Sequence, residues 1–404
     1  MKRTQPALTL ALPWWIGAAI APAGVAVAQV ETSTPAAEAP GEAAPRETTP
    51  TLEERVANIE AKQDGTAETL GIMSPVLDAL SNIKLSGYAQ GRFEYHADSK
   101  IGVSATGKPA TTTQFLVRRG RLKTTYRGQW AELVLQIDAS SSGVSLKDAE
   151  ATFVEPWSGL ELVRITGGQF KWPFGYEVLQ SSSERQMPER ARVIRTLFPG
   201  ERDRGFRLKV SYEWLHFAAA VVNGNGTTDS VYGGNDQNTM KDVVGRAGAD
   251  FDWLVFGVSG YIGEGLSTKL GDATSPTTIT DFVKARLGAD AQVYLDVPSV
   301  GGLALKGEVV YAKDAGGSTP FGFWFLAVQN IGESLGVFAR YDYFDADLDQ
   351  AGDAISGIGG GAQYFLSPNF RLSAVYERPI SHVASGADDP TDDIFTLQLQ
   401  GMFP

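Results

Sequence analysis

The sequence predicts an all-β protein, a transmembrane barrel of 16 antiparallel strands, and three observations lead to this fold class. From residue 83 onward, apolar and polar side chains alternate with a period of two, in segments of about ten residues. The connections between segments alternate between tight links and longer loops, and the number of segments is even. After residue 28, no apolar run reaches the ~20 residues that a membrane-spanning helix needs.

The first 28 residues have the pattern of a secretory signal peptide. Lys2 and Arg3 precede a short apolar stretch, and Ala26-Val27-Ala28 forms a small-residue cleavage site. Residues 29–50 are rich in Ala, Pro, Glu and Thr, which predicts a disordered linker. The exported chain contains no cysteine, so its hydrogen-bonded sheet must hold without disulfides.

Residues 51–80 are predicted to form a short helix on the periplasmic side. Apolar positions recur there at steps of four and three residues, with Gln63 and Thr66 as polar interruptions. Two interpretations remain open, a coiled coil that implies an oligomer and a single amphipathic helix that lies on its own domain. The seam positions are Leu52, Val56, Ile59, Gln63, Thr66, Leu70, Met73, Leu77 and Leu80.

The barrel is predicted to occupy residues 83–404. The predicted strands are 83–96, 115–127, 130–139, 146–155, 160–170, 204–212, 214–223, 242–252, 253–263, 281–294, 302–312, 320–329, 333–344, 355–366, 369–379 and 392–403. Short links such as Gly128-Gln129 follow the even-numbered strands, and longer connections such as 140–145 and 171–203 follow the odd-numbered ones. In a barrel of this size, we expect each apolar row to face lipid and each polar row to face a wet lumen.

The predicted second strand carries a basic row, Arg119, Arg121, Lys123 and Arg127, on one of its two faces. Each such residue facing lipid at mid-bilayer costs roughly 2–4 kcal/mol, so we expect the row to face the lumen. Arg118 breaks the alternation, and we expect it to extend toward the lipid head groups. Arg207 and Lys209 on the sixth strand extend the inward basic surface.

The basic row has two interpretations. It is either a ladder that lowers the barrier for an anion in the pore, or a row neutralised by inward carboxylates. The carboxylates that would neutralise it are Glu132, Asp138, Asp148 and Glu150 on the next two strands.

The connection 171–203 is the longest of the chain and combines charged residues with apolar ones. Because it includes Val193, Ile194, Leu197 and Phe198, we expect it to fold into the barrel and narrow the pore. The alternative is an exposed charged loop. The candidate constriction residues are Lys171, Arg185, Arg190, Arg192 and Arg195.

Four short stretches, in order, resemble the phosphate-selective porin O and P family. They are RRGRLK at 118–123, KDAEATF at 147–153, GGQFKWPFGYE at 167–177 and VVNGNG at 221–226. The resemblance implies a trimeric porin of 16 strands with an inward-folded third loop and a row of cations leading to a central anion site. It implies that Arg119, Arg121 and Lys123 are ladder residues and that Lys171 begins the constriction loop.

The predicted function is therefore that of an outer-membrane porin, a passive diffusion channel for small anions such as phosphate or polyphosphate. The first alternative is a general porin for small polar nutrients. An enzyme is not expected, because the three histidines lie in no nucleophile motif. An adhesin does not explain the basic row.

The expected partners are two further copies of the chain, outer-membrane lipid, lipopolysaccharide and small anionic solutes, with no nucleic acid. No calcium-loop or histidine-cluster spacing occurs, so we predict no metal and no cofactor. The expected location is the cell outer membrane of a Gram-negative bacterium.

Overall fold

The computed structural model describes residues 62–63, 80–97, 112–158, 162–227, 238–269, 278–381 and 393–403. The predicted signal peptide (1–28) and linker (29–50) lie outside these residues, as does most of the predicted helix at 51–80. These three predictions therefore stay predictions.

The barrel consists of strands in which apolar and polar side chains alternate. In chain order they are β1 (Ile83–His96), β2 (Thr112–Arg127), β3 (Ala131–Ser140), β4 (Gly143–Val154), β5 (Val163–Lys171), β6 (Arg202–Tyr212), β7 (Leu215–Val222), β8 (Asp242–Phe251), β9 (Leu254–Lys269), β10 (Thr278–Val297), β11 (Gly301–Lys313), β12 (Phe321–Ile331), β13 (Leu335–Asp345), β14 (Ile355–Ser367), β15 (Phe370–Ser381) and β16 (Ile394–Phe403). A six-residue helix, α2 (Arg192–Leu197), follows β5, and a 3-10 turn, η1 (Ala315–Gly317), follows β11.

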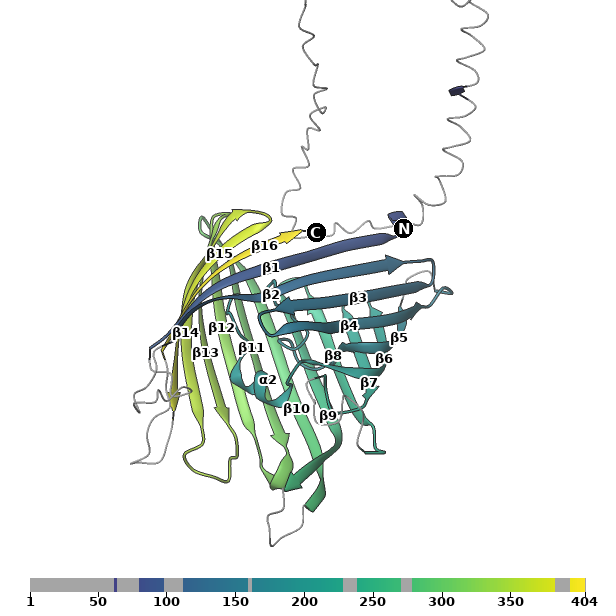
Figure 1. The fold of residues 1–404 in the computed structure, drawn as a ribbon, viewed down its shortest axis with the longest axis vertical. Helices are drawn as coiled ribbons and strands as arrows, with labels where there is room; N and C mark the ends of the chain where they lie inside the picture. The colour runs from purple at the N-terminus through teal and green to yellow at the C-terminus, as the bar shows by residue number, and fades with distance from the viewer. Residues whose placement is uncertain are drawn as a thin grey trace, which may run out of the picture. The chain divides into compact units, whose positions relative to one another are not determined.

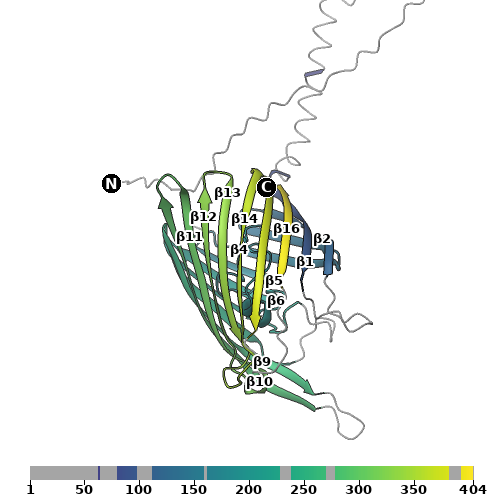
Figure 2. The same ribbon diagram turned by 90° about the vertical axis from the view of Figure 1, so that its left-hand side faces the viewer.

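Each strand pairs antiparallel with its neighbours in the sequence, and β1 pairs with β16 to close the barrel (Figures 1 and 2). The closing pair matches Gly87 with Phe403 and His96 with Ile394. Closure leaves no strand edge unpaired, which a sheet in hydrocarbon requires because lipid supplies no hydrogen bonds. The predicted fold class, a barrel of 16 antiparallel strands, is confirmed.

The two faces of the sheet are divided as predicted. On β3, Leu133 and Leu135 have exposed fractions of 49 % and 53 %, whereas Asp138 on the opposite face is buried at 7 %. An exposed apolar row around a barrel requires lipid outside it. Among the described residues, no helix combines the length and apolarity that crossing a bilayer takes.

The strands are joined by short links at one end, here called the turn end, and mostly by longer ones at the other, the loop end. Exposed tryptophans lie at or beside several turn-end links, namely Trp130, Trp157, Trp214 and Trp253. Aromatic side chains at this level are typical of the lipid–water interface.

One predicted long connection is wrong. The gap expected at 140–145 is a tight turn of only Ser141 and Ser142, because β4 begins at Gly143. Gly143 has a φ of +121°, which a residue with a Cβ rarely adopts, so the chain reverses there at little cost.

The connection between β5 and β6, residues 172–201, is here called loop L3. It lies inside the barrel, where its apolar side chains pack on inward-facing side chains of the wall, and α2 contacts β12 and β13 (Figure 1). Gly322 on β12 shows how closely they approach, since a Cβ there would lie 2.6 Å from that of Val193. The buried apolar core of this protein is therefore formed between L3 and the wall.

Candidate functional site

The apolar side of L3 is held by aromatic packing. Phe198 is fully buried, with its ring centroid 4.5 Å from that of Phe174 and 5.6 Å from that of Trp172. The guanidinium of Arg286, on β10, lies 4.8 Å from the Phe198 ring centroid and adds a cation–π contact. These contacts fix one side of L3 against the wall.

The polar groups of L3 are tied to the wall by hydrogen bonds. The donors are side chains of β1, β13, β15 and β16, and the acceptors are backbone carbonyl oxygens of the segment 182–189. The bonds run from Gln90 to Ser182 (3.2 Å), from Arg371 and Gln400 to Ser183 (3.0 and 3.1 Å), from Arg371 to Arg185 (3.2 Å), from Arg92 to Pro188 (3.3 Å) and from Arg340 to Glu189 (2.7 Å). L3 thus crosses the lumen and narrows it.

The carboxylate of Glu189 binds three arginines of the neighbouring wall. Its oxygens lie 2.7 Å from Arg118 Nε, 3.0 Å from Arg92 Nη1 and 3.3 Å from Arg119 Nη2. Burial opposes ionisation of this group, but Arg119, Arg185 and Arg118 outweigh it and hold the pKa of Glu189 well below its usual range. Glu189 is therefore an anion at neutral pH.

The prediction that Arg118 extends toward the lipid head groups is wrong. In the β1–β2 register Gln90 pairs with Arg119 and Gly91 pairs with Val117, so Arg118 is the extra residue of a β-bulge. The bulge lets Arg118 join Arg119 at the Glu189 carboxylate inside the barrel. Strict period-two reasoning missed this because a bulge interrupts the alternation.

Most of the predicted basic row is paired with carboxylates of adjacent strands. Arg121 Nε lies 3.0 Å from Asp138, and Arg127 Nε lies 3.0 Å from Glu132 at the exposed turn-end rim. On β6, Arg207 lies 2.6 Å from Glu150, whereas Lys209 is exposed opposite Arg164. Among the described residues, Lys123 is half-buried and forms no ion pair.

The candidate cations of L3 have different surroundings. Lys171 is the last residue of β5 and donates to the carbonyls of Leu179 and Gln180, 2.9 and 2.8 Å away. Arg190 is buried, binds Glu201 and donates to the Glu177 carbonyl. Arg192 is half-buried at the start of α2, and Arg195 is exposed at the end of the same helix.

Arg185 differs from the other L3 cations. Its side chain is buried, at 4 % exposed, yet none of its guanidinium nitrogens bonds to a partner in the described part of the chain. Burial of the group and the neighbouring charge of Arg190 lower the pKa of Arg185 to about 10. It is still protonated at neutral pH. An unpaired buried cation is costly, so this position is suited to an anion supplied from outside the chain.

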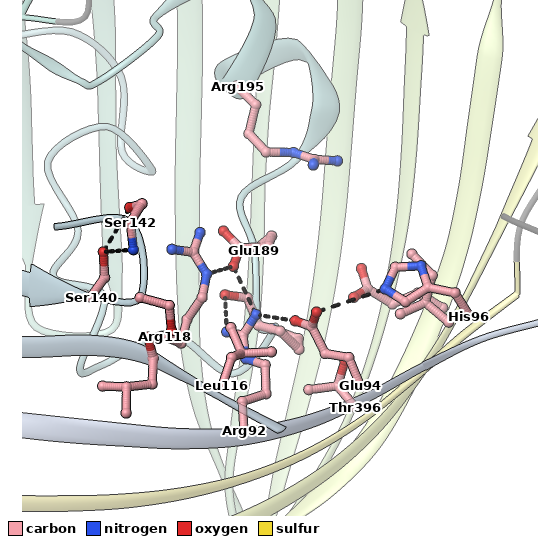
Figure 3. A pocket seen from close by; sticks show the side chains of 15 residues that line it. Arg92, Glu94, His96, Leu116, Arg118, Ser140, Ser142, Glu189, Arg195 and Thr396 are labelled. Carbon is pink, nitrogen blue, oxygen red and sulfur yellow. Dashed lines mark hydrogen bonds and ion pairs between the residues drawn. The ribbon is translucent and has the colours of Figure 1, made fainter. Parts of the chain in front are cut away.

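A cavity of about 500 Å³ lies at the loop end beside L3. Figure 3 shows Glu189 between Arg118 and Arg92, with Arg195 extending from α2 and Glu94 beside His96. The cavity is lined by these charged side chains and by apolar ones such as Leu116 and Ile394. In the described residues, no group of three or more His, Cys, Asp or Glu side chains is placed to hold a metal ion.

The sequence placed the basic row and the long connection inside the barrel, but it did not show which charges meet. Glu189 lies 71 residues from Arg118 and 97 residues from Arg92 along the chain. For Arg92, the available signal was its inward position in the alternation of β1.

A closed antiparallel barrel with an apolar outer face, a charged interior and a long loop folded across the lumen defines a porin. A family model described as phosphate-selective porin O and P matches residues 89–293, about half of the chain. The chain belongs to the phosphate-selective porin O and P family, as its sequence motifs indicated, and is an outer-membrane channel rather than an enzyme.

Solved porins share the fold at low sequence identity. An anion-selective porin from Comamonas acidovorans is 13 % identical with a TM-score of 0.57, covering 80 % of this chain and 99 % of that one. OprB of Pseudomonas putida is 9 % identical with a TM-score of 0.57, covering 82 % and 96 %. The outer membrane channel DcaP of Acinetobacter baumannii is 10 % identical with a TM-score of 0.55, covering 80 % and 97 %. No curated protein matches the chain in sequence.

Proposed function

We propose that this porin passes small anions, phosphate among them, by passive diffusion along the basic wall and through the constriction at L3. The observation that carries the proposal is the buried guanidinium of Arg185, whose nitrogens have no hydrogen-bond partner in the described part of the chain. An anion of the permeating solute would supply the missing hydrogen bonds, and an oxoanion such as phosphate suits the planar donor set of arginine.

The distribution of ion pairs supports the same preference. Glu189 accepts from three arginines and Glu201 from two. Around these two loop carboxylates, guanidinium groups therefore outnumber the negative charges that they bind. Arg371, which reaches the carbonyl of Arg185, binds only neutral acceptors among the described residues. Selectivity follows charges within about one Debye length of the path (~8 Å at physiological salt), so the net charge of −12 on the whole chain does not oppose it.

The alternative function is a general or weakly selective porin for small polar nutrients. The close pairing of Arg121 with Asp138, of Arg202 with Asp148 and of Arg246 with Asp290 favours it. In this alternative, the wall charges serve mainly to hold the strands and L3 in place.

The assembly and orientation are part of the proposal. Three copies of the chain, each with its own closed barrel, would assemble into a trimer, as in OmpT of Vibrio cholerae, whose structure is described as a trimer form (9 % identity, TM-score 0.53). The loop end would face the outside, in contact with lipopolysaccharide, and the segment 51–80 would lie in the periplasm.

The experiment is a reversal-potential measurement in a potassium chloride gradient, followed by competition with inorganic phosphate. We expect the wild type to prefer anions and phosphate to reduce chloride conductance. Arg185→Gln should shift the reversal potential toward cations and weaken the competition by phosphate. Lys313→Gln removes the same charge from an exposed position at the end of β11 and is the matched control.

The pH dependence gives a second readout. Because the pKa of Arg185 is about 10, its charge is complete at neutral pH and is lost as pH rises through that value. The wild type should therefore lose part of its anion preference near pH 10. The Arg185→Gln channel should show a smaller loss, because it has no charge at this position to lose. A wild-type channel without ion preference, or one indifferent to phosphate, would support the general porin instead.

A further inference from the structure

We infer that Glu189 is the residue that sets how strongly the basic wall acts on a permeating ion. The inference rests on the proposed function, because it concerns the selectivity of the same constriction. Glu189 is a carboxylate on L3 that lowers the positive potential of the wall, and its removal should make the channel more selective for anions.

The Glu189 carboxylate lies between L3 and the wall. It bonds to Arg92 of β1 and to Arg118 and Arg119 of β2, and it remains 24 % exposed. It lines the cavity of about 500 Å³ at the loop end (Figure 3). A charge that borders water in the pore acts directly on the ions there.

Two of the three arginines form their only ion pair within the described residues with Glu189. Arg92 also binds Glu94, at 2.8 Å. Within the described residues, Arg118 forms an ion pair only with Glu189, and Arg119 adds only the neutral amide of Gln90. Neutralising Glu189 therefore leaves the guanidinium groups of Arg118 and Arg119 without an ion-pair partner among the described residues, and Arg118 lines the cavity.

L3 has anchors on the wall that do not involve the Glu189 carboxylate. L3 is tied to the wall through backbone carbonyls, including that of Glu189 itself, which accepts from Arg340 Nη1 at 2.7 Å. Arg371 and Gln400 hold Ser183, and the apolar core holds the other side. These contacts do not involve the Glu189 carboxylate, so L3 should keep its place when the carboxylate becomes an amide.

The test compares Glu189→Gln with Glu189→Asp, which keeps the charge. The readouts are the reversal potential in a potassium chloride gradient and the size limit for neutral polyethylene glycols. For Glu189→Gln we expect the anion-to-cation permeability ratio to rise about two- to fivefold, as one unit charge near the path produces at moderate salt. The polymer size limit should be unchanged, and Glu189→Asp should stay close to the wild type.

Glu132 offers a matched control, because it also pairs with two arginines, Arg127 and Arg164, but lies near the turn end. Glu132→Gln should shift the ratio less than Glu189→Gln does. An unchanged ratio in Glu189→Gln overturns the inference, and so does a shift that appears equally in Glu189→Asp together with a larger polymer size limit, which reports a displaced loop. The comparison is between variant and wild type, so it stays decisive even if the wild type prefers cations and the proposed function fails.

Discussion

At the scale of single residues, a charge in the lumen acts on a passing ion whether or not a carboxylate pairs with it, because Coulomb energies add. Arg121 and Asp138 form a buried pair, 3.0 Å apart, on facing positions of β2 and β3. The pair contributes little net potential, yet removing only the arginine removes a full positive charge from the wall.

A variant pair tests this additivity. Arg121→Gln alone should shift the reversal potential toward cations and lower stability, because Asp138 is left buried without its partner. The double variant Arg121→Gln with Asp138→Asn should return the selectivity close to that of the wild type. A double variant that remains shifted as far as the single one would contradict additivity and point to a direct contact between Arg121 and the solute.

Sequence reasoning at this scale placed the basic residues on the lumen face but not their pairing. Alternation decides which face a side chain occupies, which is why Arg119, Arg121 and the carboxylates of β3 and β4 were assigned inward. Pairing depends on strand register and on the path of L3, which bring together residues far apart in the chain. The unpartnered state of Arg185 among the described residues is a property of that packing.

At the scale of elements, L3 is held by an apolar core on one side and by hydrogen bonds on the other. Phe198 is the centre of the apolar side, and its removal should cost about 3–5 kcal/mol of local packing. The strands are paired through their own backbones and do not depend on this contact.

Phe198→Ala should therefore loosen L3 without opening the barrel. We expect a larger size limit for neutral polymers and noisier single-channel currents, with unchanged β circular dichroism. Phe115→Ala is the control, since that side chain lies on β2 with 85 % of its surface exposed. Unfolding of the whole barrel by Phe198→Ala would show that L3 is part of the barrel's stability.

The elements themselves were largely predictable, because period two, glycine and turn residues are local signals. The exceptions have a common physical cause, which is that a single residue changes the local geometry. Gly143 shortened a predicted loop to two residues, and the bulge at Arg118 turned a predicted outward side chain inward.

At the scale of the whole molecule, the barrel keeps its polar groups away from lipid by closing on itself. Every strand has two neighbours, so releasing any one strand requires the loss of two complete ladders of hydrogen bonds. Such a structure should stay folded in detergent at room temperature and unfold only on heating. The closed fold was predictable from the even number of strands and their alternating side chains. A closed barrel places every apolar face against lipid and every polar face against water.

A gel experiment tests this consequence. Unboiled protein in dodecyl sulfate should migrate differently from boiled protein, with a slower band if the proposed trimer persists. Cross-linking before electrophoresis supplies the copy number independently. Identical migration with and without boiling, or a predominantly helical spectrum, would count against a stable barrel in solution.

The bulge on β2 also has a consequence for charge density. In a regular strand, side chains on one face follow each other every ~6.6 Å along the chain, because alternate residues point away. The extra residue at Arg118 brings two consecutive guanidinium groups to the same face, at about half that spacing. The positive charge per unit length of β2 is therefore locally about twice that of a regular strand with a cation at every inward position. This dense segment lies beside the cavity at the loop end.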